Sequence, residues 1–266
     1  SSMQAASRKK YAASYLDHLT TRIRDEVIVF LHLPKNGGTT FTDLLWNNHN
    51  PWRTFHWNLP RRRPDLGVVS LSAGSFDELD RMKKHLARIQ HRIECVTGHI
   101  PFGIHEYMDR KCLYTAFIRH PVSRAWSALN HVINTGNKEL VPVKVYGGDI
   151  VKILENDDFP FCNDQSRMLL GTDEKNLDAG DIERVISHVE QNFFYIDVLD
   201  RLEQGMTAIE QHFGWKTKVS GRKNEGIYKN RLPETDPKIQ HLIEEKNQLD
   251  IALYNYLMER SPQTPE

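Results

Sequence analysis

The chain has 266 residues, of which 39% are hydrophobic and 26% charged, and its formal net charge is zero. This composition is typical of a globular protein that is long enough for one large α/β domain or two small ones. The balanced charge argues against a protein that coats nucleic acid electrostatically, so we expect no nucleic-acid partner. No run of about 18 apolar residues occurs, so we expect no membrane span.

The cysteine pattern bears on the compartment. Cys95, Cys112 and Cys162 are far apart and show no CxxC spacing. A sparse, odd set favours reduced thiols over a disulfide framework, although the count leaves room for one bridge. The first residues, SSMQAAS, contain no signal-peptide core. We therefore expect a cytoplasmic protein, with the Golgi lumen as the alternative if an N-terminal anchor precedes this sequence.

The first half of the chain alternates apolar runs with helical patterns. Val27–Leu33 is apolar without alternation, as in a buried parallel strand. The spacing of Phe41, Leu44 and Leu45 predicts a helix from Thr39. Residues 49–75, rich in Pro, Arg, Trp and Gly, are expected to form a long loop.

Further strands and helices follow in alternation, which predicts an α/β fold with a central parallel β-sheet flanked by helices. We expect a single domain over residues 26–260, with an N-terminal extension (1–25) and a C-terminal tail (261–266). The expected strands are Glu94–Thr97, Cys112–Ile118 and Phe193–Val198; the expected helices are Asp77–Gln90, Val122–Ile133, Phe161–Leu170, Ile182–Gln191, Arg201–Phe213 and one long amphipathic helix, Asp236–Glu259.

The first predicted strand leads into a glycine-rich turn that opens a helix, the usual way to cradle a phosphate. The turn reads Pro34-Lys35-Asn36-Gly37-Gly38-Thr39-Thr40. Its glycines permit close backbone approach, and the N–H groups and hydroxyls at the helix start can donate to phosphate oxygens. The Walker pattern has its lysine after the second glycine, whereas here the lysine precedes both. The alternative is an ordinary strand–turn–helix connection.

A second candidate site follows the strand Cys112–Ile118, in the stretch YTAFIRHPVSRAW and the serine after it. The strand delivers Arg119 at its carboxyl end, where ligands bind in open α/β sheets. Arg119 and Ser127 bracket a helix start and could hold a second phosphate, the arginine through a bidentate fork. Alternatively, Arg119 caps backbone carbonyls. Arg124 is expected to be a surface or ion-pair residue.

Together these motifs resemble the sulfotransferases that use 3′-phosphoadenosine 5′-phosphosulfate (PAPS), leaving the bisphosphate PAP as product. The resemblance is closest to the branch of the heparan sulfate 2-O- and 6-O-sulfotransferases and their bacterial relatives, and runs from about Val27 to Tyr256. It implies a P-loop-like α/β fold. It also implies that residues 35–40 (Lys35, Asn36, Gly37, Gly38, Thr39 and Thr40) hold the 5′-phosphosulfate, and that Arg119 and Ser127 hold the 3′-phosphate.

Three further segments resemble family elements. CVTGHIPFGIH matches the segment that carries the family's catalytic histidine, which falls on His99. FCNDQSRMLLG matches a segment near the acceptor site and implies substrate binding by Asn163, Gln165 and Arg167. GRKNEG matches a late loop over the nucleotide and implies cofactor binding by Arg222, Lys223 and Asn224. The chain departs from the family in Asn36, where threonine is frequent, and in Arg-His-Pro instead of Arg-Asp-Pro.

The chemistry of sulfuryl transfer suits these residues. The reaction is an in-line displacement in which negative charge grows on the leaving oxygen, so Lys35 is expected to neutralise that oxygen. His99 is the expected base for the acceptor hydroxyl. His105 and Glu106 are reserve bases, and His32 is expected to be buried beside the loop. No set of His or Cys with ligand spacing implies a metal.

The acceptor is expected to be a hydroxyl compound, most naturally a glycan. Arg61, Arg62 and Arg63 could attract an anionic sugar or form a solvated charge run. Trp52, His56 and Trp57 could stack on sugar rings or anchor the loop to the core. A P-loop-type small-molecule kinase and a non-catalytic nucleotide-binding scaffold are the rival interpretations of the same sequence.

Overall fold

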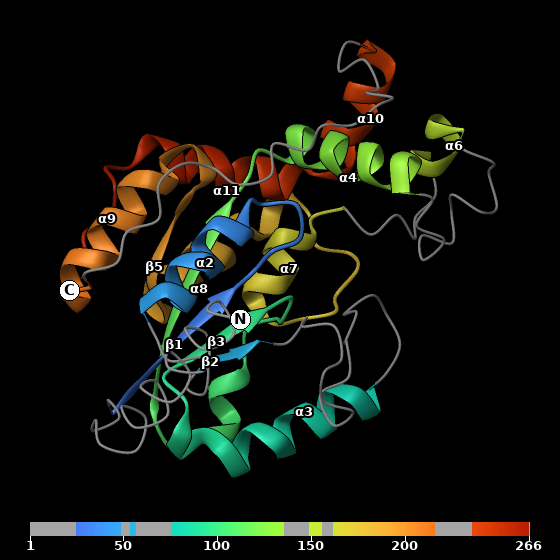
Figure 1. The fold of residues 1–266 in the computed structure, drawn as a ribbon. Coiled ribbons are helices and arrows are strands. Elements are labelled where there is room, and N and C mark those ends of the chain that lie inside the picture. Colours follow the sequence, from blue (N-terminus) through green and yellow to red (C-terminus); the bar gives the residue numbers. More distant parts are fainter. Residues whose placement is uncertain are drawn as a thin grey trace, which may run out of the picture.

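A five-stranded parallel sheet forms the centre of the protein, in the order β2-β3-β1-β4-β5 (Figure 1). The computed structural model describes residues 25–48, 54–56, 76–135, 149–155, 162–215 and 236–265. The predicted α/β fold with a parallel sheet is confirmed. The strands are β1 (Glu26–Leu31), β2 (Thr54–His56), β3 (Cys95–Gly98), β4 (Lys111–Ile118) and β5 (Phe193–Val198).

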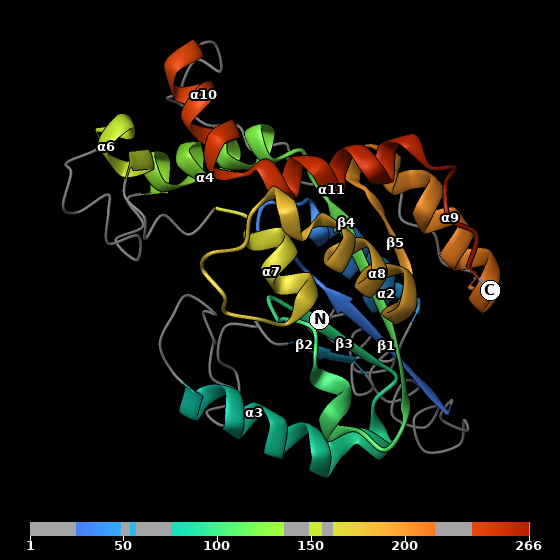
Figure 2. The ribbon, with the colours of Figure 1, turned by 180° about the vertical axis from the view of Figure 1, so that it is seen from behind.

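Helices cover both faces of the sheet, which explains why β1 is apolar throughout. Val27, Val29 and Leu31 pack in one core cluster with residues of α7, α8 and α11. Ile28 and Phe30 pack on the opposite face with residues of α2 and α9. Figure 2 shows α7, α8 and α11 from their side of the sheet. Because successive side chains of a strand point to opposite faces, a strand between two helical layers needs apolar residues at every position.

The helices lie in three groups. Those on the sheet faces are α2 (Gly38–Asn48), α7 (Asp164–Leu170), α8 (Ile182–Asn192), α9 (Leu202–Phe213) and α11 (Gln248–Glu259). The helix α3 (Phe76–Ile89) lies beside the β2–β3 side of the molecule (Figure 1). A separate apolar cluster joins α4 (Pro121–Thr135), α6 (Ile150–Glu155) and α10 (Pro237–Lys246).

The prediction of one long helix over Asp236–Glu259 is wrong, because the helix is interrupted at Asn247 and forms two helices, α10 and α11. Asn247 has φ −126° and ψ 25°, outside helical geometry. Its Nδ2 donates to Ile243 O at 2.9 Å at the end of α10, and its Oδ1 accepts from Asn163 N at 3.0 Å. An asparagine side chain that bonds the backbone competes with the helix ladder, and here it ends one helix before the next begins.

The loop predicted over residues 49–75 contains a strand, β2, which pairs with β3 from Thr54↔Cys95 to His56↔Thr97. Three residues are too few to show a period, so nothing in the sequence marks this edge strand. The remainder of that segment lies outside the described residues.

The strand order places the carboxyl ends of β3, β1 and β4 side by side. After β1 the chain forms β2 and β3 on one side of β1, then crosses to β4 and β5 on the other. In open α/β sheets such a reversal leaves a ligand crevice outside the strand ends. None of the helices in the described part of the chain has the length and apolar character to cross a membrane.

Candidate functional site

The loop after β1 turns sharply before it enters α2. Lys35 and Gly37 both have φ of +66°. This left-handed region is costly for a residue with a side chain, so Lys35 is held there by its surroundings. The first turn of α2 carries no acidic residue. Since the first turn of a helix leaves N–H groups without intrahelical acceptors, this end of α2 favours an anion.

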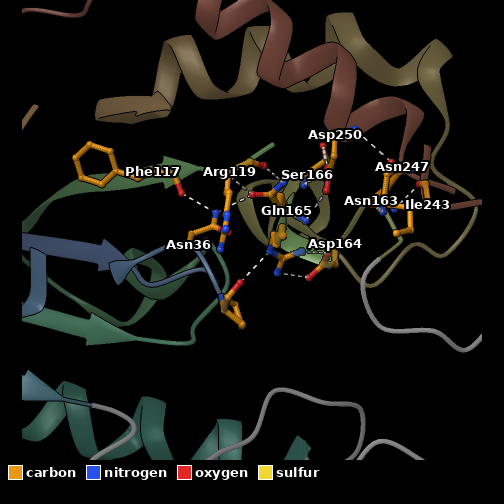
Figure 3. A network of polar contacts seen from close by, with 12 residues as sticks. Asn36, Phe117, Arg119, Asn163, Asp164, Gln165, Ser166, Ile243, Asn247 and Asp250 are labelled. Carbon is orange, nitrogen blue, oxygen red and sulfur yellow. Dashed lines mark hydrogen bonds and ion pairs between the residues drawn. The ribbon is translucent and has the colours of Figure 1, made fainter. Parts of the chain in front are cut away.

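Asn36 points its side chain into the protein rather than toward solvent, with 2% exposure. Its Nδ2 donates to Phe117 O at 2.8 Å and to Gln165 Oε1 at 2.7 Å (Figure 3). Its backbone N–H donates to Leu33 O at 3.2 Å within the turn. Asn36 therefore fastens the loop to β4 and α7, and both of its amide donors are occupied by protein oxygens.

Arg119 follows the last residue of β4 and reaches the same loop. Its Nη1 donates to Lys35 O at 3.0 Å, and its backbone N–H donates to Gln165 Oε1 at 3.1 Å. The glycine-rich turn and the residue after β4, which were predicted as two separate phosphate sites, are thus joined by one direct hydrogen bond to the Lys35 backbone. Burial, and secondarily the positive charge of Arg119, lowers the pKa of the Lys35 ammonium. A bound anion would relieve both effects.

Arg124 is an ion-pair residue, as one alternative expected, but it is buried rather than on the surface, with 1% exposure. Its guanidinium pairs with both carboxylate oxygens of Asp164, with Nη2–Oδ2 at 2.7 Å. Its Nε donates to Pro34 O at 2.8 Å. The sequence analysis did not predict that Arg124 supports the loop. The only signal was its place as the second arginine of the motif RHPVSR.

Ser127 lies one turn after Arg124 on α4 and is half-buried. His131 lies one turn further along, so the three share a helix face. Burial lowers the pKa of His131, and the charge of Lys35 lowers it further. This face of α4 is therefore turned toward the loop after β1. Arg124 contacts that loop directly, and the charge of Lys35 in the loop lowers the pKa of His131. Sequence reasoning did not single out His131.

His99 follows β3 directly and lies against His32, which follows β1. The two ring centroids are 4.7 Å apart, with the planes at 73°. His32 in turn covers Gly38, where an added Cβ would lie 2.2 Å from the His32 Cδ2 atom. His32 was expected to be buried beside the loop; it lies beside the loop and is half-buried. His32 thus packs between the His99 ring and the start of α2.

The reserve base His105 contacts Tyr114, which lies in the middle of β4 rather than at its carboxyl end. Its Nδ1 lies 2.8 Å from Tyr114 Oη, which also accepts from the backbone N–H groups of His105 and Gly103. Tyr114 lies four residues before the end of β4, so it is about 13 Å from that end. This placement favours His99 over His105 as the histidine near Lys35 and Arg119.

The three residues expected at the acceptor site differ in their surroundings. Gln165 has 0% exposure, and its side chain bonds Asn36 and Arg119. Asn163, with φ +49°, accepts through Oδ1 from the N–H groups of Leu249 and Asp250 and so caps α11. Arg167 is half-buried, and among the described residues its guanidinium makes no hydrogen bond or ion pair.

Several expected residues lie outside the described part of the chain: Arg222, Lys223, Asn224, Arg61, Arg62, Arg63, Trp52 and Trp57. Thr39 is exposed and Thr40 is buried in the first turn of α2. Within the described ranges, no group of three or more His, Cys, Asp or Glu side chains is arranged to hold a metal ion.

Comparison with known proteins identifies the family. A family model described as the sulfotransferase family matches residues 18–257, which is most of the chain. No individual curated protein matches the sequence significantly. The matched range includes β1 with its loop, β4 with Arg119, and α7. The chain belongs to the sulfotransferase family.

Proposed function

We propose that this protein transfers the sulfuryl group of PAPS to an acceptor hydroxyl, most naturally on a glycan, within the branch that resembles the heparan sulfate 2-O- and 6-O-sulfotransferases. One observation carries the proposal. The Lys35 loop, Arg119 and His99 follow three neighbouring parallel strands, β1, β4 and β3, and Arg119 donates directly to Lys35 O. Two cations and a potential base therefore share one edge of the sheet.

The residues present fit a ligand with two phosphates. Lys35 is held in a desolvated position beside a second cation, an arrangement that a multiply charged anion stabilises. The first turn of α2, with Gly37, Gly38, Thr39 and Thr40, would hold the 5′-phosphosulfate, and Arg119 and Ser127 the 3′-phosphate. Arg222, Lys223 and Asn224 are proposed to complete the nucleotide site.

The chain's own groups would carry the proton and charge movements. When bound, PAPS supplies the sulfuryl group and an oxygen of its 5′-phosphate as the leaving atom. Lys35 would stabilise the negative charge that grows on that oxygen. His99 would accept the proton of the acceptor hydroxyl as the hydroxyl oxygen attacks sulfur, since imidazole suits this role near neutral pH.

Arg167 is the strongest of the three acceptor-binding candidates. It is half-buried and makes no ion pair among the described residues, so its charge is available to a carboxylate or sulfate of an acidic sugar. Asn163 and Gln165, whose side chains bond other protein groups, would support the acceptor site indirectly.

A cytoplasmic location is proposed from the thiols. The three cysteines form no disulfide. Burial raises the pKa of the Cys112 and Cys162 thiols to about 11, which keeps them protonated and unreactive at neutral pH. Fractionation of cells expressing the natural gene product tests this; recovery with Golgi membranes contradicts it.

The donor can be tested by ligand-induced thermal shift. Adenosine 3′,5′-bisphosphate should raise Tm, and ATP with magnesium should raise it less. Transfer of labelled sulfate from PAPS should then be measured on acidic glycans, neutral glycans and phenols, and the acidic glycans should accept it best. A response to ATP with magnesium and none to the bisphosphate would favour a kinase. Bisphosphate binding without transfer to any acceptor would favour a non-catalytic scaffold.

A further inference from the structure

Gln165 bonds both of the segments that are predicted to hold a phosphate. It lies on α7 with 0% exposure. Its Oε1 accepts from Asn36 Nδ2 at 2.7 Å and from Arg119 N at 3.1 Å, and its Nε2 donates to Arg119 O at 2.9 Å (Figure 3). One side-chain amide therefore bonds both the loop after β1 and the end of β4.

Two further contacts close this arrangement. Asn36 Nδ2 also donates to Phe117 O at 2.8 Å, and Arg119 Nη1 donates to Lys35 O at 3.0 Å. Lys35 and Arg119, proposed to act on different phosphates, are thereby joined both directly and through Asn36 and Gln165. A displacement of either strand end would break several buried hydrogen bonds at once.

Gln165 is itself fixed from behind by α11. Asp250, with 0% exposure, accepts from Gln165 N at 3.2 Å through Oδ2 and from Ser166 N at 2.8 Å through Oδ1. The Ser166 hydroxyl donates to the same Oδ1 at 2.6 Å. Because the carboxylate holds the first turn of α7, the side chain of Gln165 has a fixed backbone from which to reach forward.

We infer that Gln165 is a positioning residue that sets the separation between the Lys35 loop and Arg119, so that one ligand engages both with its two phosphates. The inference rests on the proposed function. Two binding elements held at a fixed separation gain affinity for a ligand of matching span, since the second contact forms at a high effective concentration. Loss of the separation removes that gain while each element still binds its own phosphate.

The experiment compares two nucleotides in the unaltered protein and three variants. Dissociation constants for adenosine 3′,5′-bisphosphate and adenosine 5′-monophosphate are measured by calorimetry with the unaltered full chain, Gln165→Leu, Gln165→Glu and Ser166→Ala. The dissociation constant of the monophosphate divided by that of the bisphosphate measures how much affinity the 3′-phosphate adds. Gln165→Leu should lower this ratio about tenfold, since the leucine leaves the Asn36 and Arg119 donors unpaired and the strand ends can shift.

Ser166→Ala is the matched control, because it removes one buried side-chain hydrogen bond but keeps both backbone N–H donations to Asp250 that hold the first turn of α7. It should lower Tm and leave the ratio unchanged. Gln165→Glu keeps the acceptor atom but places a second oxygen against Arg119 O, so it should give an intermediate ratio. It also serves as the test if the leucine variant does not fold.

The outcomes separate the two proposals. If the intact protein prefers the bisphosphate and both Gln165 variants keep that preference in full, the positioning role is overturned and the proposed function stands. If the intact protein binds neither nucleotide, the proposed function fails. An equal fall of the ratio in Ser166→Ala would show a general loss of packing and would also overturn the specific role of Gln165.

Discussion

The imidazole rings of His32 and His99 meet edge to face, 4.7 Å apart, at the ends of two adjacent parallel strands. The register that pairs Leu31 with Gly98 makes these two histidines neighbours. His32 also packs against Gly38, at the start of α2. The predicted base follows β3 and also packs against His32, which borders the loop that is proposed to bind the donor.

His99→Ala should reduce kcat about 10²–10⁴-fold, because the acceptor hydroxyl loses its base. Binding of adenosine 3′,5′-bisphosphate should stay within about twofold, as His99 is not proposed to contact a phosphate. Steady-state sulfate transfer and calorimetry check the two parts. His105→Ala is the control and should retain turnover; an unaffected His99→Ala enzyme would remove His99 as the base.

Gly38→Ala should weaken bisphosphate binding about tenfold or more, because the new methyl group would overlap the His32 ring and displace the loop. The second substitution His32→Ala, made in the Gly38→Ala protein, should restore much of the binding by removing that ring. Calorimetric titration of both variants checks this. Binding that is equally poor in both would mean that the overlap is not the cause.

The alkaline limb of kcat/KM should begin below the pH at which an exposed lysine titrates. Burial and the charge of Arg119 lower the pKa of Lys35 from 10.5, so its protonated form is lost as pH rises through that lowered value. Lys35→Arg keeps its charge at all accessible pH values and should move the limb upward, at some cost in rate. Identical limbs in the two enzymes would assign the limb to another group.

Arg124→Ala should lower the free energy of unfolding by about 3–5 kcal/mol, since it leaves the Asp164 carboxylate without its partner. Urea denaturation measures this change. The double variant Arg124→Met, Asp164→Leu should recover part of the stability but not donor binding, because the contact from Nε to Pro34 O stays lost. Full recovery of both properties would show that the contact to Pro34 is unimportant.

Stability should decline as pH falls from about 7.5 to about 5.5. Burial lowers the pKa values of His120, His131 and His188 in the folded protein, so in this range the unfolded chain binds more protons. By linkage, the free energy of unfolding then falls as pH decreases through the unfolded value of about 6.5. Urea denaturation at several pH values checks the slope, and the His120→Gln, His188→Gln variant should flatten it.

The strands β1, β3, β4 and β5 and the turn between β1 and α2 could be predicted because their signals are local. Val27–Leu33 is uniformly apolar, and the paired glycines follow it directly. The position of Arg119 followed from the same reasoning, since it comes just after a buried strand. In each case residues close in sequence determine the local structure, which is the situation that pattern analysis handles well.

The supporting contacts could not be predicted in the same way. Asn36 and Gln165 are 129 positions apart, and no periodicity relates them. The break at Asn247 depends on Asn163, which caps α11 from another element, so the apolar spacing across the break still reads as one helix. These features arise from tertiary contacts that override local propensity.

The buried amide of Gln165 limits motion at the proposed donor site. The backbone N–H of Arg119 donates to Gln165 Oε1 in a part-buried network around a fully buried side-chain amide, so its hydrogen should exchange with solvent more slowly than that of an exposed backbone amide. The loop around Asn36 is joined to the same network. If these residues bind the donor as proposed, their positions are set by buried and part-buried hydrogen bonds before the donor arrives.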